Sequence, residues 1–204
     1  MARRRYEQRL RAEAAEETRR RILDALYARL GEAPSRPVTV DEIARRAGVA
    51  RSTVYLIFGS RAGLFDALTT HLFRGAGYDR LLQAVRHPDA RQHLRGGLAA
   101  GAEIFAAHRD VFRVLFSMAE LDPDAVGDAV RRTEAARAEG MVRLAERPAE
   151  QGVLRPALTV REAADVVWLM ASFDAFDLLY TARGLPVDEV GRLLGDVAER
   201  ALCR

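Results

Sequence analysis

The order of hydrophobic and polar residues predicts helices along nearly the whole chain. Apolar residues return every three or four positions, and no stretch alternates strictly between apolar and polar residues as a half-buried strand does. Within residues 18–30 the apolar side chains fall on one helical stripe, which comprises Ile22, Leu23, Leu26, Tyr27 and Leu30. Gly31 and the proline-containing segment 34–37 end this helix.

Two much shorter helices follow. Thr39-Val-Asp-Glu42 has the sequence of a capping box, in which the threonine hydroxyl and the glutamate carboxylate satisfy backbone amides reciprocally. This box predicts a helix over 40–47, which ends at Gly48 in a left-handed cap. A second helix is expected over 51–58, and Ser60 caps another. Two short helices around a glycine turn are typical of a helix-turn-helix, whose second helix lies in the major groove of DNA.

Longer helices are expected in the remaining chain, at 88–107, 109–119, 123–150, 160–183 and 187–202. Thr159-Val-Arg-Glu162 is a second capping box and begins the fourth of them. The sequence therefore predicts an all-α protein with a three-helix head and a larger helical body. We expect a basic arm at 1–17, a helix-turn-helix domain at 18–68 and the body at 69–204.

Composition excludes several classes of function. The chain has 204 residues, is 49% hydrophobic and 30% charged, and therefore suits a globular protein with a core. All its basic residues are arginine, so a P-loop lysine and Schiff-base chemistry are excluded. A single cysteine, Cys203, excludes a disulfide framework and a cysteine metal cluster. The apolar run 166–171 is too short to cross a bilayer, and no secretory signal follows the first arginines, so we expect a cytoplasmic protein without a cofactor.

Charge is distributed unevenly between the two parts of the chain. Residues 1–61 contain 14 arginines and eight acidic residues, whereas residues 62–204 contain 18 arginines and 21 acidic residues. A basic N-terminal part indicates a polyanionic partner for that part only. The arginines of the arm, among them Arg3, Arg4 and Arg5, either enter a minor groove or form a solvated tail.

The predicted second helix of the motif carries residues suited to reading DNA. Arg51, Ser52 and Thr53 stand at its start, where recognition helices contact base edges. Arginine is the commonest reader of guanine, and serine and threonine hydroxyls contact bases or phosphates. Tyr55 lies one turn further on, with a hydroxyl for a phosphate. Arg61, with the amides at the start of the next helix, is placed for another phosphate.

These residues resemble the N-terminal signature of TetR-type transcriptional repressors. The resemblance covers about residues 18–68 and is carried by Thr39, Ile43-Ala44, Ala47-Gly48-Val49, Thr53-Val54-Tyr55, Phe58-Gly59-Ser60-Arg61 and Leu64. It implies that DNA-contact positions are occupied by Thr39, Arg51, Ser52, Thr53, Tyr55 and Arg61, to which we add Leu56 and Ser60 beside them. The chain departs from the family at Ala50, where a capping serine is usual, and at Leu56 and Ile57, where polar or aromatic residues are usual. The side chain of Leu56 or Ile57 is suited to packing against a thymine methyl group. The alternative, that these positions have lost hydrogen bonds to base edges, is equally open.

The resemblance also implies a body that binds a small effector and dimerises through its last two long helices. The sequence permits this, since the helix expected at 160–183 is apolar on nearly every side and must be covered on every side. A partner subunit is the simplest cover, and with the helix at 187–202 it forms half of a two-fold symmetric interface. Two-fold symmetry predicts a pseudo-palindromic operator.

Large apolar residues and one histidine are the expected lining of the effector pocket. They are Phe105, His108, Phe112, Phe116, Met141, Trp168, Met170, Phe173 and Phe176. Ligand cavities are mostly apolar with a few polar anchors. Each of these apolar residues also fits an ordinary core, and His108 also fits a helix boundary.

An enzyme is disfavoured because no nucleophile–base pair and no metal-ligand spacing occurs. The sequence thus predicts a homodimeric repressor that binds a palindromic double-stranded DNA operator and is released by a small, hydrophobic effector. The alternative is an architectural or interaction protein that uses the same head to bind DNA without an effector.

Overall fold

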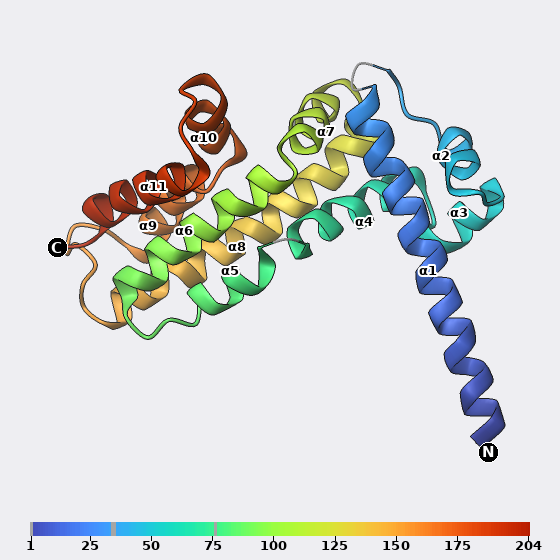
Figure 1. The fold of residues 1–204 in the computed structure, drawn as a ribbon. Helices are drawn as coiled ribbons and strands as arrows, with labels where there is room; N and C mark the ends of the chain where they lie inside the picture. Colours follow the sequence, from blue (N-terminus) through green and yellow to red (C-terminus); the bar gives the residue numbers. More distant parts are fainter. Residues whose placement is uncertain (1, 34–35, 76) are drawn as a thin grey trace. The chain divides into compact units, whose positions relative to one another are not determined.

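The computed structural model describes residues 2–33, 36–75 and 77–204, with the backbone alone for residues 2–8. Apart from one isolated β-bridge between Leu154 and Cys203, the regular structure of the described residues is helical, which confirms the all-α prediction (Figure 1). The chain forms two compact units. The first contains the residues up to Thr69 together with Arg113–Val130, and the second contains Thr70–Phe112 and Arg131–Arg204.

The first unit contains the predicted helix-turn-helix. Its elements are α1 (Ala2–Glu32), α2 (Val40–Ala47), α3 (Arg51–Phe58), most of α4 (Arg61–Arg74), the C-terminal part of α7 (Arg109–Leu121), the π-helix η1 (Pro123–Gly127) and the first residues of α8 (Asp128–Glu150). Its core is built from the predicted stripe on α1, where Ile22 and Leu26 are completely buried. Ile43 of α2 and Phe65 of α4 are also completely buried.

Helix α1 is longer than the sequence pattern predicts. It begins at Ala2 instead of residue 18, so the expected arm is a continuation of the helix. Residues 9–17 have no apolar stripe, but they are rich in good helix formers and charged pairs. Arg9 and Glu13 form an ion pair of 2.7 Å one turn apart, which supports an exposed helix. The side chains of Arg3, Arg4 and Arg5 lie outside the described residues.

The second unit is a bundle of helices. It holds the end of α4, α5 (Tyr78–Ala84), α6 (Ala90–Ala107), the start of α7, most of α8, α9 (Val160–Met170), α10 (Phe173–Asp177), the π-helix η2 (Leu178–Ala182) and α11 (Val187–Leu202). Helices α6 and α11 lie side by side (Figure 1). Glycine permits this close packing, since a Cβ atom on Gly191 would lie 2.9 Å from the Cα atom of Ala99. On the next turn of α11, a Cβ atom on Gly195 would lie 3.2 Å from the Cα atom of Arg95.

The helix expected at 160–183 is interrupted. Its first part, α9, starts with the predicted capping box of Thr159 and Glu162 and ends at Met170. Ser172 then has an extended backbone, and its hydroxyl accepts a hydrogen bond from the amide of Ala175 at the start of α10. Arg137 of α8 donates to the carbonyl of Ala171 at the break. The break therefore has its own cap and a side-chain donor from another helix, and neither shows in the apolar pattern of 160–183.

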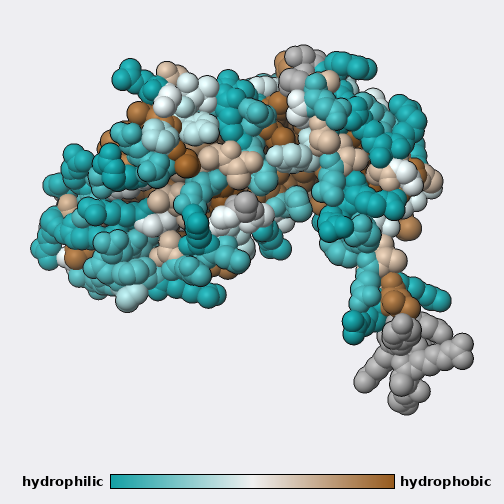
Figure 2. Space-filling model, viewed as in Figure 1, coloured by the Kyte–Doolittle hydropathy of each residue, from teal (hydrophilic) through white to brown (hydrophobic). Residues whose placement is uncertain are grey.

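No helix among the described residues is long and apolar enough to span a bilayer. On the face of the molecule seen in Figure 2, hydrophilic residues predominate and hydrophobic residues form smaller patches between them.

Candidate nucleic-acid interface

Helix α2 is fixed at both ends by the residues that the sequence predicts. The Thr39 hydroxyl accepts a hydrogen bond of 3.2 Å from the amide of Glu42, and Gly48 has the left-handed backbone of a C-cap, with φ of 64°. The prediction that the Glu42 carboxylate accepts a hydrogen bond from the Thr39 amide, which would complete a capping box, is wrong, however. The carboxylate of Glu42 accepts from Arg29 of α1 and pairs with Arg46, instead of turning back to the Thr39 amide.

Arg29 is a buried cation that joins α1 to α2 and to the loop between them. Its side chain is 1% exposed and its Nε atom donates to Glu42 Oε1 over 2.6 Å. The same guanidinium donates to the carbonyls of Ala33 at 2.7 Å and of Arg36 and Pro37 at 3.2 Å each. Burial by itself would raise the pKa of Glu42, but the hydrogen bond and charge of Arg29 lower it. This network sets where α2 starts.

The opposite end of α2 and the end of α3 are also held by α1. Arg21 donates a hydrogen bond of 2.9 Å to the carbonyl of Ala47, which is an otherwise unsatisfied group at the C-terminus of α2. The guanidinium carbon of Arg19 lies 5.3 Å from the centre of the Phe58 ring at the end of α3. The two short helices are therefore positioned by the long one.

Helix α3 buries one side and exposes the other. Val54 is buried in the unit, whereas Arg51, Ser52, Tyr55 and Leu56 are exposed, Leu56 to 85%. Thr53 is half-buried and Thr39 is exposed. Ala50 stands at the N-cap with an extended backbone and makes no side-chain cap hydrogen bond, and within the first turn the Thr53 amide donates to the Ala50 carbonyl over 3.0 Å.

Arg51 and Tyr55 interact on the exposed side of α3. Arg51 donates a hydrogen bond of 3.4 Å to the Tyr55 hydroxyl, and its guanidinium carbon lies 5.4 Å from the centre of the tyrosine ring. Asp41 of α2 accepts from the same guanidinium over 3.0 Å. The hydrogen bond to Tyr55 and the charge of Asp41 raise the pKa of Arg51. The guanidinium is thus oriented by Tyr55 and Asp41.

Ser60 and Arg61 begin α4 directly after α3. The Ser60 hydroxyl accepts from the amide of Gly63 over 2.9 Å, which confirms the predicted cap. Arg61 forms an ion pair with Asp122, and its guanidinium carbon lies 5.3 Å from the centre of the Phe65 ring. Its charge is therefore engaged within the first unit, and the phosphate contact expected for Arg61 stays a prediction.

Four of the residues expected in an effector pocket meet in the second unit. Phe105, Phe112, Phe173 and Phe176 are buried, and the ring of Phe105 lies 5.1, 5.4 and 5.7 Å from the other three. Phe73 of α4 joins them, 5.9 Å from Phe105. We call these five residues the phenylalanine cluster. Arg137 lies over the rings of Phe73 and Phe105.

The other five expected residues lie elsewhere. Met141 and Met170 are half-buried against a separate apolar core around Leu98 and Leu144. The remaining three are Trp168, which is 41% exposed, Phe116, which belongs to the first unit, and His108, which is the C-cap of α6. Burial and the nearby His71 lower the pKa of His108.

Sequence reasoning missed two acidic residues at the interface and one aromatic residue in the body. Asp41 and Asp122 are ion-pair partners of Arg51 and Arg61, and Phe73 is part of the phenylalanine cluster. Asp41 precedes Arg51 by ten residues and Asp122 follows Arg61 by 61, so no local spacing indicates either pair.

Comparison with known proteins agrees with this geometry. Residues 22–68 match the family described as bacterial regulatory proteins, tetR family. No curated protein sequence matches the chain. Among solved structures, NalD, the secondary repressor of the MexAB-OprM multidrug efflux pump in Pseudomonas aeruginosa, is 24% identical, with a TM-score of 0.70 over 94% of this chain and 98% of its own.

Two further structures show the same fold. A TetR family transcription regulator from Marinobacter aquaeolei VT8 is 17% identical, with a TM-score of 0.68 over 94% of this chain and 98% of its own. The complex of SmeT with triclosan is 18% identical, with a TM-score of 0.68 over 92% of each chain. Regulators of this kind bind DNA and are not enzymes. Residues 22–68 therefore carry the N-terminal domain of the tetR family of bacterial regulatory proteins, and the whole chain has the fold of these solved regulators.

Proposed function

We propose that the protein is a homodimeric transcriptional repressor that binds a palindromic operator in the cytoplasm and leaves it when a small hydrophobic effector binds. The observation that carries the DNA-binding part is the exposed side of α3. There, Arg51 and Tyr55 contact each other on the second helix of a helix-turn-helix. In such motifs this helix enters the major groove with its N-terminal residues on the bases.

The contacts follow from the chemistry of each side chain. Arg51 donates two hydrogen bonds to O6 and N7 of a guanine, and Tyr55 donates its hydroxyl to a phosphate. Ser52 and Thr53 reach a base or the backbone, and Leu56 packs on a thymine methyl group. Thr39 and Ser60 add phosphate contacts at the starts of α2 and α4, where backbone amides favour an anion.

The dimer is supported by apolar residues left exposed on the C-terminal elements. Leu178 of η2 is 65% exposed, Leu169 of α9 is 57% exposed, and Trp168 and Val197 are about 40% exposed. Burying large apolar side chains lowers the free energy by about 25 cal/mol for each Å² of apolar surface removed from water. A second copy of the chain covers them in an isologous interface, in which each subunit uses the same surface.

We expect Leu169→Glu to prevent dimerisation. The symmetric interface would bury two uncompensated carboxylates, so dimer affinity should fall on the order of 100-fold. Sedimentation of the wild type and the variant measures this directly. Val142→Glu is the matched control, since Val142 is a 39% exposed residue of α8 and the variant should remain dimeric. A dimeric Leu169→Glu variant would contradict the proposed interface.

The effector part of the proposal is supported by the phenylalanine cluster and by the relatives. A cluster of aromatic side chains suits a hydrophobic ligand, and the similar SmeT structure is a complex with triclosan. The effector releases DNA only if it binds one dimer geometry more tightly than the other. In the released state the two heads no longer match the half-site spacing.

A thermal-shift screen of hydrophobic metabolites and drugs tests the effector directly. A compound present at 100 times its dissociation constant stabilises the folded state by about 2.7 kcal/mol, which raises the melting temperature of a protein of this size by roughly 5 °C or more. The same compound should release the protein from its operator. A screen without any shift would favour the alternative, an architectural DNA-binding protein that needs no effector.

A further inference from the structure

The N-terminal half of α1 extends beyond the helix-turn-helix. Helix α1 is continuous from Ala2 to Glu32, and neither glycine nor proline occurs between residues 2 and 30. We call residues 2–17 the N-terminal extension. Residues 9–17 are all exposed, and the first buried residue among the described side chains of α1 is Ile22. Packing within the first unit therefore does not explain the extension.

The extension starts next to the turn by which α1 holds the two helices of the motif. Arg19 lies over Phe58 at the end of α3, and Arg21 donates to the carbonyl of Ala47 at the end of α2. From this turn the extension runs past α2 and α3 (Figure 1). A helix rises about 1.5 Å per residue, so residue 5 lies roughly 21 Å along α1 from Arg19. This distance equals about six base pairs of DNA at 3.4 Å each.

The charge of the sequence changes sign along the extension. Residues 2–11 contain five arginines and one glutamate, whereas residues 12–17 contain three glutamates and no arginine. Within four positions of the arginines at 3–5, the sequence has one carboxylate, that of Glu7. Side chains on a helix pair with residues three or four positions away, so these arginines outnumber the acidic partners within their reach. An excess of positive charge therefore belongs to the far end of the extension.

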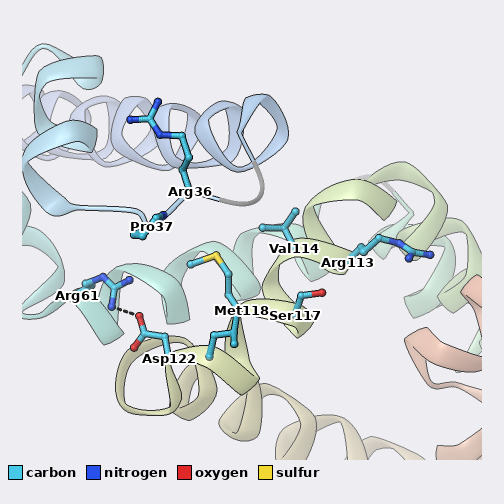
Figure 3. Close-up of a pocket in the computed structure, with 9 residues that line it drawn as sticks. Arg36, Pro37, Arg61, Arg113, Val114, Ser117, Met118 and Asp122 are labelled. Atoms are coloured by element: carbon cyan, nitrogen blue, oxygen red, sulfur yellow. Dashed lines mark hydrogen bonds and ion pairs between the residues drawn. The ribbon is translucent and has the colours of Figure 1, made fainter.

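The arginines at the start of α3 and of α4 are, in contrast, already paired with carboxylates. Arg51 pairs with Asp41 over 3.0 Å, and Arg61 pairs with Asp122, as the dashed line in Figure 3 marks. Neutralisation of phosphates by arginine supplies much of the affinity of a protein for DNA. The extension therefore adds positive charge to what α3 and α4 offer to DNA.

The helical form of the extension decides which part of DNA it contacts. A helix with its side chains is about 10–12 Å wide, whereas the minor groove of B-DNA is about 6 Å wide. The extension is therefore too wide for the minor groove, which is one of the two roles expected for an arginine arm. Guanidinium groups also bind phosphate oxygens, and these contacts carry no sequence information. A helix of this length without packing is marginal in water, so phosphate contacts also stabilise it.

We propose that the far end of the N-terminal extension binds the sugar–phosphate backbone of double-stranded DNA, up to about six base pairs from those that α3 contacts. This inference rests on the proposed operator binding, to which it adds a second contact that is insensitive to sequence. The glutamates of residues 12–17 lie between the two contacts and repel the phosphates there. The extension thus acts as a rigid helical arm.

Hydroxyl-radical footprinting on an operator selected from random DNA tests the second contact. The wild type should protect the backbone up to about six base pairs beyond the region that the variant Arg3→Gln/Arg4→Gln/Arg5→Gln protects. If the three arginines neutralise three phosphates, raising the salt from about 50 to about 200 mM should weaken wild-type binding roughly 40-fold more than binding of the variant. Both proteins should enrich the same operator motif, because the lost contacts do not read bases.

A proline variant distinguishes a rigid helix from a flexible tail. Ala12→Pro keeps every arginine of the extension but interrupts the helix behind residues 2–11. Its footprint should shrink like that of the triple variant, whereas Ala12→Ser should keep the wild-type footprint. The charge control removes three exposed arginines of the second unit and should also keep it: Arg86→Gln/Arg143→Gln/Arg161→Gln.

The outcomes separate this inference from the proposed function. A wild-type footprint in the triple arginine variant would overturn the second contact and leave operator binding intact. A wild-type footprint in Ala12→Pro would overturn the rigid arm in the same way. If the wild type bound no selected DNA, the proposed function would fail, and the second contact with it.

Discussion

Arg29→Met is expected to unfold the DNA-binding head at temperatures where the wild type is folded. The substitution removes a guanidinium that is 1% exposed and that donates to three loop carbonyls and to the Glu42 carboxylate. Breaking a buried ion pair by deleting one partner costs about 3–5 kcal/mol. Urea unfolding followed by circular dichroism, with hydrogen exchange of the α2 amides as the local probe, measures the loss.

Glu32→Gln is the control for Arg29→Met. Glu32 also forms an arginine ion pair with α2, to Arg46 at 2.7 Å, but its side chain is 58% exposed. Exposed pairs contribute about 0–1 kcal/mol, so this variant should unfold close to the wild type. An Arg29→Met protein within about 1 kcal/mol of the wild type would contradict the role given to the buried network.

The same network predicts how acid affects the head. The pKa of Glu42 is lowered in the folded protein, so its contribution to stability is fully present above the usual glutamate value of 4.5. It is lost as the pH falls through the lowered value of the folded state. Arg29→Met removes that contribution. The difference in the free energy of unfolding between the wild type and Arg29→Met should therefore become smaller in acid.

Arg51→Ala and Tyr55→Ala are each expected to weaken operator binding by about 1–3 kcal/mol, or roughly 5- to 150-fold. In the proposed complex Arg51 supplies a forked donor for guanine, and Tyr55 supplies a hydroxyl for a phosphate. Within the protein the Tyr55 hydroxyl also accepts a hydrogen bond from the Arg51 guanidinium. Fluorescence anisotropy on a labelled operator, at one fixed salt concentration, measures the affinities. Sedimentation should show the dimer unchanged in both variants.

Two further variants distinguish recognition of bases by Arg51 from the general attraction between positive charge and DNA. Arg86→Ala removes the same charge from an exposed residue of the second unit and should bind DNA within about two-fold of the wild type. Asp41→Asn removes the carboxylate beside Arg51 and should strengthen binding to unrelated DNA. The ratio of operator affinity to affinity for unrelated DNA should therefore fall. If Arg51→Ala and Tyr55→Ala kept the affinity of the wild type, α3 would not be the reading helix.

Features that depend on neighbouring residues could be predicted from the sequence. The caps at Thr39, Gly48 and Ser60 and the box at Thr159 involve partners within four residues, so their residue types and spacing carry the information. The helix expected at 187–202 agrees with α11 at both ends, because Pro186 precedes it and its apolar stripe is regular.

Features that depend on distant partners could not be predicted. The Glu42 carboxylate finds Arg29, thirteen residues earlier, instead of the nearby amide that the capping-box pattern indicates. The break at Ser172 has a donor from Arg137 of another helix. Helix α5 was missed because Gly77 begins it without a side-chain cap and none of its residues is buried.

The same distinction between neighbouring and distant partners applies to the candidate sites. The exposed side of α3 follows from helical spacing around the buried Val54, whereas the pairing of Arg51 with Asp41 does not. Periodicity places Phe105 and Trp168 on apolar helices without distinguishing them. The structure buries Phe105 among other aromatic rings and leaves Trp168 41% exposed.

Selection of DNA from a random duplex pool is the measurement that tests the central claim most directly, namely that α3 reads the sequence of an operator as one half of a symmetric pair. The wild type should enrich a motif of two inverted half-sites, whose centres are one helical turn or a whole number of turns apart. The Arg51→Ala/Tyr55→Ala variant, under the same conditions, should enrich no motif. A wild-type pool that remains random after selection, or the same motif enriched by the variant, would contradict the account.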